Sequence, residues 1–409
     1  MRKCILISLF LVITIIYCKG KHSNQQISSY ILSESVVTHE LVFGAEDLPD
    51  EYLLAVPISF VVDNDGNIYV ADEEYKIKIY DSKGNGRKII GGRGEGPGEF
   101  FIIAQMNIDN KDTLFVSDRQ ISRFNIFHRD TFIKTESLLN KPSKDYKTEK
   151  QKDRINHIQG FSISLLNRIT GSQRIYKTGG DTLISGNDFA LNVGLLYEYN
   201  DTLNELVTYS PSNLENLTQF GSVGSVDRSS IGYLYHYPLH SPFLTVLLPE
   251  NRIAYSHIFI DDIQNNNTFR YTIHIKDLNT MELSHITHNY KPIETKEAYD
   301  KGAFIKVMGD VEEYTKKHIY HPALCALHYD DECLFAVREA NFGRATDLNI
   351  DIPYQTDVFD AQTGTYIRTV EFPFKPQYIK NGYIYRKIKN QDGYWMIEKY
   401  RIDPRVYGK

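Results

Sequence analysis

Two aspartates that end matching apolar segments are the first candidates for chemistry in this sequence. Asp72 follows the run IYVA, and Asp118 follows the run LFVS. A ring of such carboxylates can hold a cation, whereas a carboxylate that accepts backbone N–H bonds from a neighbouring turn has only a structural role. Because the aspartate recurs at the same place in both segments, the pattern favours the structural role.

Basic side chains stand near the equivalent positions of later segments. Arg338 and Arg386 align with the two aspartates, and His257 lies close to the aligned position of an intervening segment. Carboxylates and guanidinium groups gathered at one opening suit a polar or anionic ligand. We therefore predict a ligand-binding channel mouth formed by Asp72, Asp118, His257, Arg338 and Arg386.

Other polar motifs are explained by turns and linkers. DNDGN at 63–67 resembles the start of a calcium loop but lacks the downstream bidentate glutamate, and a hairpin turn is needed there. GRGEGPG at 92–98 lacks the Lys-Ser/Thr pair of a phosphate loop, so we expect a linker. No G-x-S-x-G elbow occurs. No tight zinc spacing is found among the histidines at 236, 240, 257, 285, 288, 318, 321 and 328. We predict no catalytic residue, no metal and no cofactor.

The elements that must position these residues are short strands in a repeated pattern. YVAD at 69–72 matches FVSD at 115–118, an offset of 115 − 69 = 46 residues. Within each copy, alternating apolar residues and Asx/Gly turns predict four antiparallel strands. Such a sheet cannot bury both of its faces alone, so neighbouring copies must stack. The period and the strand number are typical of a β-propeller blade.

The repeats resemble the NHL repeat and, more broadly, the six-bladed propellers that include TolB-like proteins. The resemblance is carried by DGNIYVAD at 65–72, KIKIYD at 76–81 and GRGEGPGEF at 92–100, and it is specific over residues 57–127. It implies an all-β, six-bladed propeller of four-stranded antiparallel blades. Propellers include enzymes, scaffolds and receptors, so the resemblance implies a fold more clearly than a function.

The remaining blades are predicted from strand patterns, as one propeller domain over residues 31–405. Blades one and two cover 57–92 and 98–136, followed by a polar loop at 137–155. Blade three has strands at 161–166, 181–184, 194–199 and 205–209, and a second long connection follows at 210–237. Blade four has strands at 242–244, 252–255, 271–275 and 282–284, a helical insertion follows at 294–318, and blade five covers 322–372.

The last blade has only three predicted strands, at 377–379, 383–388 and 394–402. A further strand is predicted at 35–43, ahead of the first complete blade. Propellers remove exposed strand edges when one terminus lends a strand to the other. We therefore predict that a strand within 31–43 pairs with the strand at 394–402 and closes the ring.

The amino terminus has the order of a secretion signal. A positive MRK is followed by an apolar run at 5–17 and then by Cys18. This resembles the lipobox of bacterial lipoproteins, although Tyr17 stands where that family has a small residue. We predict a signal peptide at 1–17, lipidation of Cys18 and a tether at 18–30. Ordinary secretion with cleavage near Gly20 and an uncleaved anchor are the alternatives, and each places the rest of the chain outside the cytoplasm.

Cys325 and Cys333 lie in a predicted hairpin that turns at Asp330-Asp331. This turn pairs Cys325 with Ala336 and Cys333 with His328, and it points the two thiols in opposite directions. We therefore expect two free, buried thiols.

The formal net charge is −6, and loss of Arg2 and Lys3 with the signal would bring it to −8. This balance excludes a nucleic acid partner, which requires clustered Lys and Arg. We predict a membrane-anchored, extracytoplasmic and non-catalytic module. It would bind a protein or a small polar ligand at the channel mouth and contact the membrane through its lipid anchor. The alternative is a metal-dependent hydrolase or lyase with its site in the central channel.

Overall fold

Strands make up nearly all of the secondary structure in the computed structural model. The structure describes residues 31–32, 35–45, 48–73, 75–118, 123–137, 170–177, 190–199, 202–209, 243–258, 261–265, 268–294, 320–339 and 351–409. Within these ranges, strands β1 to β25 form six sheets. The helices described are two short 3-10 turns, η1 (Asp50–Tyr52) and η6 (Pro404–Tyr407). Among the described residues no helix is long and apolar enough to cross a membrane.

The first complete sheet shows how the repeat specifies its hairpins. Its order is β3 (Pro57–Val62), β4 (Ile68–Asp72), β5 (Lys76–Tyr80) and β6 (Gly86–Gly91), all antiparallel. In the first turn, Asp63 Oδ1 accepts the Asn67 backbone N–H at 2.7 Å, and Oδ2 accepts the Asn67 side-chain amide at 2.7 Å. Gly66 has a φ of 82°, a conformation that glycine adopts without strain. The predicted hairpin turn is confirmed.

The second sheet repeats this plan and packs on the first. It contains β7 (Ile103–Ile108), β8 (Thr113–Asp118), β9 (Arg123–His128) and β10 (Thr131–Ser137). Side chains of both sheets, such as Tyr69 and Leu114, share one buried core. In the glycine-rich linker between them, Glu99 accepts the Gly96 N–H at 2.8 Å, and the Arg123 guanidinium donates to the Glu95 and Glu99 carbonyls. These bonds confirm the linker interpretation.

The third and fourth sheets differ in part from the prediction. The third contains β11 (Thr170–Lys177), β12 (Ala190–Tyr199) and β13 (Thr202–Tyr209). Strand β11 was not predicted, and the predicted strands at 161–166 and 181–184 lie outside the described residues. The fourth contains β14 (Phe243–Leu248), β15 (Arg252–His257), β16 (Asp262–Asn265), β17 (Thr268–Asp277) and β18 (Leu283–Asn289).

Strand β16 was also missed by the sequence analysis, for a structural reason. The long strand β17 pairs with β18 along one edge, while β15 and β16 occupy successive halves of the other. The second strand of this blade is therefore interrupted, and the repeat pattern does not predict its second half. The predicted helix at 294–318 lies outside the described residues apart from Glu294, as do the loops at 137–155 and 210–237 apart from Ser137.

The fifth sheet contains β19 (Leu324–Asp330), β20 (Cys333–Arg338), β21 (Tyr354–Asp360) and β22 (Tyr366–Phe372), with β1 (Ile31–Leu32) added parallel to β22. Its first hairpin corrects the predicted register. The turn lies at Asp331 and Glu332, with φ values of 47° and 66°, and it pairs Asp330 with Cys333. A bulge at Cys325 shifts the pairing further along the strand. The prediction that both cysteines are free thiols is confirmed.

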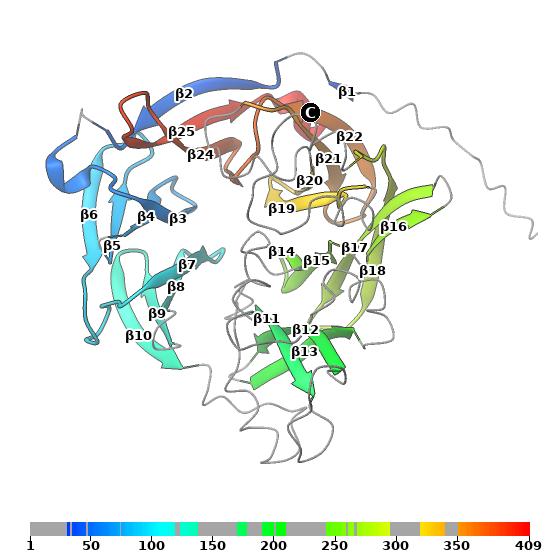
Figure 1. The fold of residues 1–409 in the computed structure, drawn as a ribbon, viewed down its shortest axis with the longest axis horizontal. Coiled ribbons are helices and arrows are strands. Elements are labelled where there is room, and N and C mark those ends of the chain that lie inside the picture. The colour runs from blue at the N-terminus through cyan, green and yellow to red at the C-terminus, as the bar shows by residue number, and fades with distance from the viewer. Residues whose placement is uncertain are drawn as a thin grey trace, which may run out of the picture. The chain divides into compact units, whose positions relative to one another are not determined.

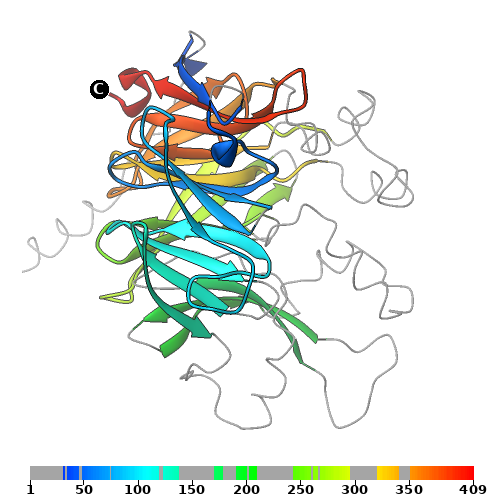
Figure 2. The same cartoon turned by 90° about the vertical axis from the view of Figure 1, so that its left-hand side faces the viewer.

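The last sheet is completed by a strand from the amino terminus. Strands β23 (Tyr378–Lys380), β24 (Tyr383–Lys389) and β25 (Trp395–Ile402) are joined by β2 (Val37–Phe43), which pairs antiparallel with β25. Figures 1 and 2 show this blue strand beside the red carboxyl-terminal strands. Phe43 packs under Gly84 of the first sheet, where a Cβ would lie 2.8 Å from the Phe43 Cβ. The predicted pairing of the two termini is confirmed.

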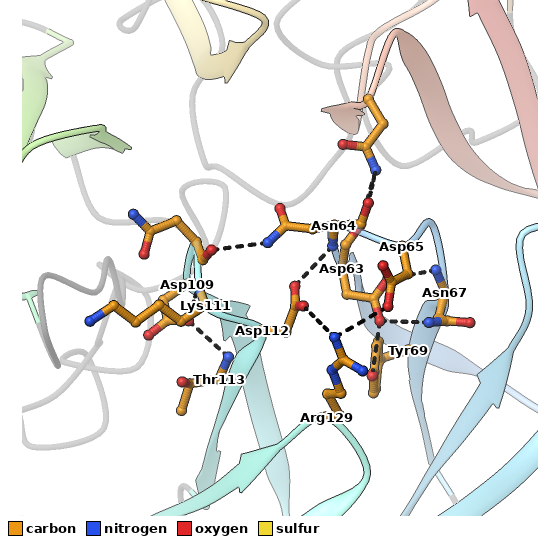
Figure 3. Close-up of polar contacts among 12 residues, drawn as sticks. Asp63, Asn64, Asp65, Asn67, Tyr69, Asp109, Lys111, Asp112, Thr113 and Arg129 are labelled. Atoms are coloured by element: carbon orange, nitrogen blue, oxygen red, sulfur yellow. Dashed lines mark hydrogen bonds and ion pairs between the residues drawn. The ribbon is translucent and has the colours of Figure 1, made fainter.

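Successive sheets share buried cores and also touch through their turns. One core joins the fourth and fifth sheets, another the fifth and last, and a third the last and first. At the turns, Asp112 Oδ1 accepts the Asn64 N–H at 2.9 Å, and the Arg129 guanidinium lies 3.4 Å from Asp65 and 3.6 Å from Asp112 (Figure 3). The Asn381 side-chain amide donates to the Asp63 carbonyl at 3.1 Å. Four-stranded antiparallel sheets stacked in this way are the blades of an all-β propeller.

Candidate functional site

Asp72 and Asp118 lie at equivalent strand ends, and their carboxylates bind the backbone. Asp72 is fully buried and accepts the N–H groups of Ala55 and Val56 at 2.9 and 2.7 Å. Asp118 is 1% exposed and accepts the N–H groups of Phe101 and Ile102 at 2.8 and 3.3 Å. In both blades the carboxylate therefore holds the segment that leads into the first strand. This is the structural role that the repetition favoured.

Asp72 also has a buried cationic partner. The Lys78 ammonium lies 2.9 Å from Asp72 Oδ2, and the two side chains are 2% and 0% exposed. The ammonium also donates to the Leu53 carbonyl. Because the Asp72 oxygens already face this cation and backbone N–H groups, few of their lone pairs point toward solvent.

His257 is buried at the end of β15, the position equivalent to the two aspartates. Its backbone N–H donates to Asp261 Oδ2 at 2.8 Å, and its carbonyl accepts the Asp261 N–H at 3.0 Å. The imidazole is 0% exposed. His257 thus helps to fix the interruption between β15 and β16.

Arg386 occupies a different position from the one predicted. It lies in the middle of β24, three residues before the strand ends at Lys389, whereas the other four candidates end their strands. Its guanidinium is paired with two carboxylates, Asp351 and Glu398, the latter at 2.6 Å, and stacks over Phe374 at 3.8 Å. Burial alone would lower the pKa of Arg386, but the two carboxylates raise it. Its charge is therefore neutralised within the protein.

Arg338 ends β20 as predicted, and its guanidinium has neutral partners. Nη1 donates to Gln355 Oε1 at 2.8 Å, and Nη2 donates to the Lys291 carbonyl at 2.7 Å. The guanidinium lies over the Tyr290 ring, 5.5 Å from its centroid. Within the part of the chain that the structure describes, Arg338 forms no ion pair with a carboxylate.

A half-buried acid, Asp262, is hydrogen-bonded to the tyrosine that contacts this arginine. The Tyr290 hydroxyl donates to Asp262 Oδ1 at 2.7 Å, and Asp262 Oδ2 accepts from Gln264 and from the Ala323 backbone at 2.8 and 2.9 Å. Burial raises the pKa of Asp262 to about 6, even though these three hydrogen bonds lower it. We call Asp262, Gln264, Tyr290, Arg338 and Gln355 the Arg338 cluster.

The Arg338 cluster spans the fourth and fifth sheets. Asp262 and Gln264 come from β16, Tyr290 follows β18, and Arg338 and Gln355 come from β20 and β21. Among the described residues, the hydrogen bonds and ion pairs of Asp72, Arg338 and Arg386 join three separate groups, and none of these contacts links the three predicted residues to one another. Asp262 and Tyr290 were missed because β16 was not predicted. The polar turn DDIQNNNT at 261–268 was the available signal.

The described residues offer no preformed metal centre of ordinary size. Among them, no group of three or more His, Cys, Asp or Glu side chains is arranged to hold a metal ion. The acidic turn at 63–67 uses its Asp63 oxygens for Asn67 and, at 3.2 Å, for the Tyr69 hydroxyl (Figure 3). The carboxylate of Asp63 therefore stabilises the turn.

One family model and several solved structures are similar to this chain. A family model described as "6-bladed beta-propeller" matches residues 49–162. An exported protein from Bacteroides fragilis NCTC 9343 is similar in structure, with 13% identity, a TM-score of 0.43, and coverage of 90% of this chain and 96% of that chain. Streptogramin B lyase has 12% identity, a TM-score of 0.36 and coverage of 85% and 95%. BamB from Moraxella catarrhalis has 9% identity, a TM-score of 0.31 and coverage of 90% and 98%.

No curated protein matches the chain by sequence. The matching family model covers both repeats found in the sequence, and its description agrees with the stacked four-stranded sheets. The chain is therefore an all-β propeller, as the sequence predicted. None of these similarities assigns an activity to it.

Proposed function

We propose that the chain is an extracytoplasmic, membrane-anchored β-propeller that acts as a non-catalytic binding module. The complete propeller has six blades of the NHL and TolB-like type, closed by β2. Its partner is a protein or a small polar ligand that presents an anionic group to the Arg338 cluster. The six sheets of the described residues and the repeat motifs at 65–100 support the blade number and type.

Arg338 is the observation that carries this proposal. A guanidinium has five N–H donors, and the described bonds of Arg338 use donors on Nη1 and Nη2 for two neutral oxygens. The Tyr290 ring fixes the plane of the group from one side. An arginine held in this way, partly exposed and without a carboxylate partner among the described residues, matches the geometry of a ligand carboxylate or phosphate.

A non-catalytic role is supported by the state of the predicted acids. The Asp72 and Asp118 carboxylates hold backbone N–H groups of their own blades, and Asp72 also faces Lys78. A carboxylate engaged in this way is a poor general base, because its charge is already stabilised and its lone pairs are occupied.

The location outside the cytoplasm rests on the amino-terminal sequence. A positive start, an apolar run at 5–17 and Cys18 follow one another in the order of a bacterial lipoprotein signal. Processing at Cys18 leaves residues 18–30 as a tether between the lipid and β1. Stable membrane anchoring normally requires two membrane-binding groups, and a diacylated amino-terminal cysteine carries two acyl chains.

The binding proposal is tested by affinity capture from an envelope extract, with the full-length mature protein as bait. Arg338→Ala should lose captured partners that the wild-type protein retains, because the anionic group loses its fork of donors. Arg87→Ala is the matched control, since Arg87 is exposed and, among the described residues, donates to the Asn67 side chain at 2.6 Å. Equal recovery by wild type and Arg338→Ala, with both proteins folded, contradicts the proposal.

Metal analysis of the purified protein tests the enzyme alternative. One equivalent of Ca²⁺ or Zn²⁺ that resists dialysis in the wild-type protein and is lost from Asp72→Asn would favour a metal-dependent hydrolase or lyase with its site in the channel. Absence of such an equivalent supports the non-catalytic module.

A further inference from the structure

Two histidines face each other across the outer strands of the fourth sheet. His274 in β17 and His285 in β18 are direct cross-strand partners. Their Nδ1 atoms lie 2.9 Å apart, with ring centroids 4.9 Å apart and ring planes at 85°. The His285 side chain is exposed, while only 16% of the His274 side chain is accessible. The pair therefore presents two imidazole nitrogens to one point at the surface.

A buried carboxylate fixes the orientation of the inner histidine. His274 Nε2 lies 2.9 Å from Asp261 Oδ1, and the Asp261 side chain is 8% exposed. The two groups are in close contact, although His274 Nε2 forms no hydrogen bond of normal geometry in the described structure. The Tyr255 ring stacks on His274 with centroids 4.9 Å apart and an interplanar angle of 20°. The Nδ1 atom of His274 thus faces the Nδ1 atom of His285.

This arrangement is the one that proteins use to orient a metal-bound histidine. Metal-ligating histidines usually donate their second N–H to a carboxylate, which fixes the tautomer and raises the basicity of the ligating nitrogen. Asp261 Oδ1 lies 2.9 Å from His274 Nε2, so it can accept this N–H once the ring turns to bind an ion. The loop that carries Asp261 is itself fixed, because its carboxylate accepts the His257 N–H at 2.8 Å and its carbonyl accepts the Thr272 N–H at 2.8 Å.

The two nitrogens are close enough to bind one ion together. With metal–nitrogen bonds of about 2.0–2.1 Å, nitrogens 2.9 Å apart subtend an angle of about 90° at the metal. Tetrahedral coordination would require a wider separation of about 3.3–3.4 Å at the same bond length. An angle near 90° is compatible with adjacent ligands of a tetragonal or octahedral ion, and among the divalent first-row ions Cu²⁺ binds nitrogen ligands most tightly.

We propose that His274 and His285 form a binding site for a divalent transition-metal ion, with Cu²⁺ as the preferred ion. The two Nδ1 atoms are the protein ligands, Asp261 is the positioning residue, and solvent or a partner fills the other coordination positions. The ion replaces the proton that the imidazoles share in the metal-free protein. It would tie β18, the outer strand of the pair, to the body of the sheet.

The linear spacing of the histidines hides this site. Residues 274 and 285 are eleven positions apart and belong to different strands, so a search for short zinc motifs does not find them. The antiparallel register of β17 and β18 brings them into direct opposition. The site also has only two protein ligands, whereas an ordinary metal centre has three or more protein ligands.

Titration of the full-length mature protein with Cu²⁺ tests the proposal, with electron paramagnetic resonance as the readout. The wild-type protein should bind one Cu²⁺ with two coordinated imidazole nitrogens. His285→Ala should weaken this binding by about tenfold or more and leave one imidazole in the spectrum. Asp261→Asn should weaken it by about tenfold or more with two imidazoles retained, because it removes only the supporting carboxylate.

His39→Ala is the matched control, because His39 is an exposed histidine that packs edge-on against Tyr400 in another sheet. It should bind Cu²⁺ as the wild type does. Thermal melting of each variant without metal verifies that the fold is intact. If His285→Ala, still folded, keeps the wild-type affinity and both imidazole signals, the site is elsewhere and the proposal is wrong.

Discussion

At the scale of single residues, the repeated aspartates show that a conspicuous acid can be structural. Asp72 and Asp118 occupy equivalent positions in consecutive blades, and each accepts two successive backbone N–H groups that precede the first strand of its own blade. Buried N–H groups need an acceptor, and a carboxylate meets two of them with one side chain. The repeat therefore retains the aspartate to hold the connection between blades.

Replacement of Asp72 by Asn should destabilise the protein strongly. The substitution removes the negative charge 2.9 Å from the buried Lys78 ammonium, and breaking a buried pair from one side costs about 3–5 kcal/mol. The free energy of unfolding, measured by urea denaturation, should fall by that amount. Asp130→Asn is the control, because its pair with Lys88 is 40–48% exposed and contributes about 0–1 kcal/mol. A similar small loss in both variants would contradict this account of Asp72.

Asp262 should give the stability a specific pH dependence. Its pKa is raised by burial to about 6 in the folded protein, against about 3.9 in an unfolded chain. The folded state therefore holds the proton more tightly, and the stabilisation present below about pH 4 is lost as the pH rises through 6. The loss amounts to about 2–3 kcal/mol for a shift of this size.

Asp262→Asn tests this dependence, because asparagine keeps an oxygen for the Tyr290 hydroxyl but does not ionise. Urea denaturation of both proteins between about pH 4 and pH 7 is the measurement. Relative to the wild type, the variant should gain about 2–3 kcal/mol over this range. Parallel pH profiles for the two proteins would show that the Asp262 carboxyl does not titrate differently in the folded state.

At the scale of elements, strand β2 is the clearest case in which sequence logic anticipates a long-range contact. A three-stranded final blade leaves an unpaired edge, and an isolated strand near the amino terminus can cover it. The structure adds contacts that the pattern did not predict. Glu40 lies 3.2 Å from the Lys399 ammonium and 2.8 Å from the Arg401 guanidinium, and the Val36 carbonyl accepts the Asp403 N–H at 2.9 Å.

Deletion of residues 19–45 should therefore lower the stability of the whole propeller, whereas deletion of 19–28 should not. The longer deletion removes Val36 and Phe43, which are 1% and 7% exposed and contribute about 1.5–3 kcal/mol each. It also exposes the edge of β25. Thermal melting by circular dichroism should show a single transition at lower temperature for the longer deletion only. Equal melting temperatures for the two truncations would mean that β2 does not close the propeller.

The parts of the fold that the sequence predicted are those specified by local pattern. Blades one and two follow from the strong alternation of 57–136 and from Asx/Gly turns such as Asp63 to Gly66. The missed features depend on tertiary contacts. Strand β16 exists because β17 is long enough to pair with two short strands, and the hairpin before Cys333 shifted by one residue because Asp331 and Glu332 adopt positive φ values.

The candidate site was predicted less completely than the fold. The alignment predicted that Arg338 ends its strand, as Asp72 and Asp118 do. The structure has Arg338 at the end of β20, the strand that corresponds to β4 and β8. Arg386 was misplaced because the β24–β25 hairpin is longer than its counterpart in the first sheet. The partners of Arg338, such as Asp262 and Tyr290, come from the neighbouring blade, and single-sequence patterns carry no information on which blade residues meet across an interface.

At the scale of the whole molecule, the residues that stabilise the fold and the residues proposed to bind ligands lie in different parts of the sheets. The faces of the sheets are committed to the cores between neighbours, as shown by Tyr69, Tyr271 and Phe359, each 2% exposed or less. The polar groups proposed here to bind ligands lie instead at strand ends, turns and outer strands. The Arg338 cluster lies at strand ends, and the pair formed by His274 and His285 lies on an outer strand. Substitution at either place leaves the stacked cores intact.

The lipid anchor is the prediction that concerns the whole molecule, because it decides where the propeller works. If Cys18 is the acylated first residue of the mature chain, Cys18→Ala should lose its label in cells fed a radioactive or clickable fatty acid. The variant should also leave the membrane fraction, since the segment that directly follows Cys18, residues 19–29, is mostly polar.

Two other cysteines provide matched controls for this experiment. Cys4 is removed with the signal peptide in the proposed processing, and Cys333 is buried with a thiol whose pKa is raised by burial to about 11. Cys4→Ala and Cys333→Ala should therefore keep both the label and the membrane location. A label that persists in Cys18→Ala would contradict the lipoprotein assignment. Loss of the label with continued membrane binding would instead indicate an uncleaved apolar segment at 5–17, because only a segment that remains attached can hold an unacylated chain in the bilayer.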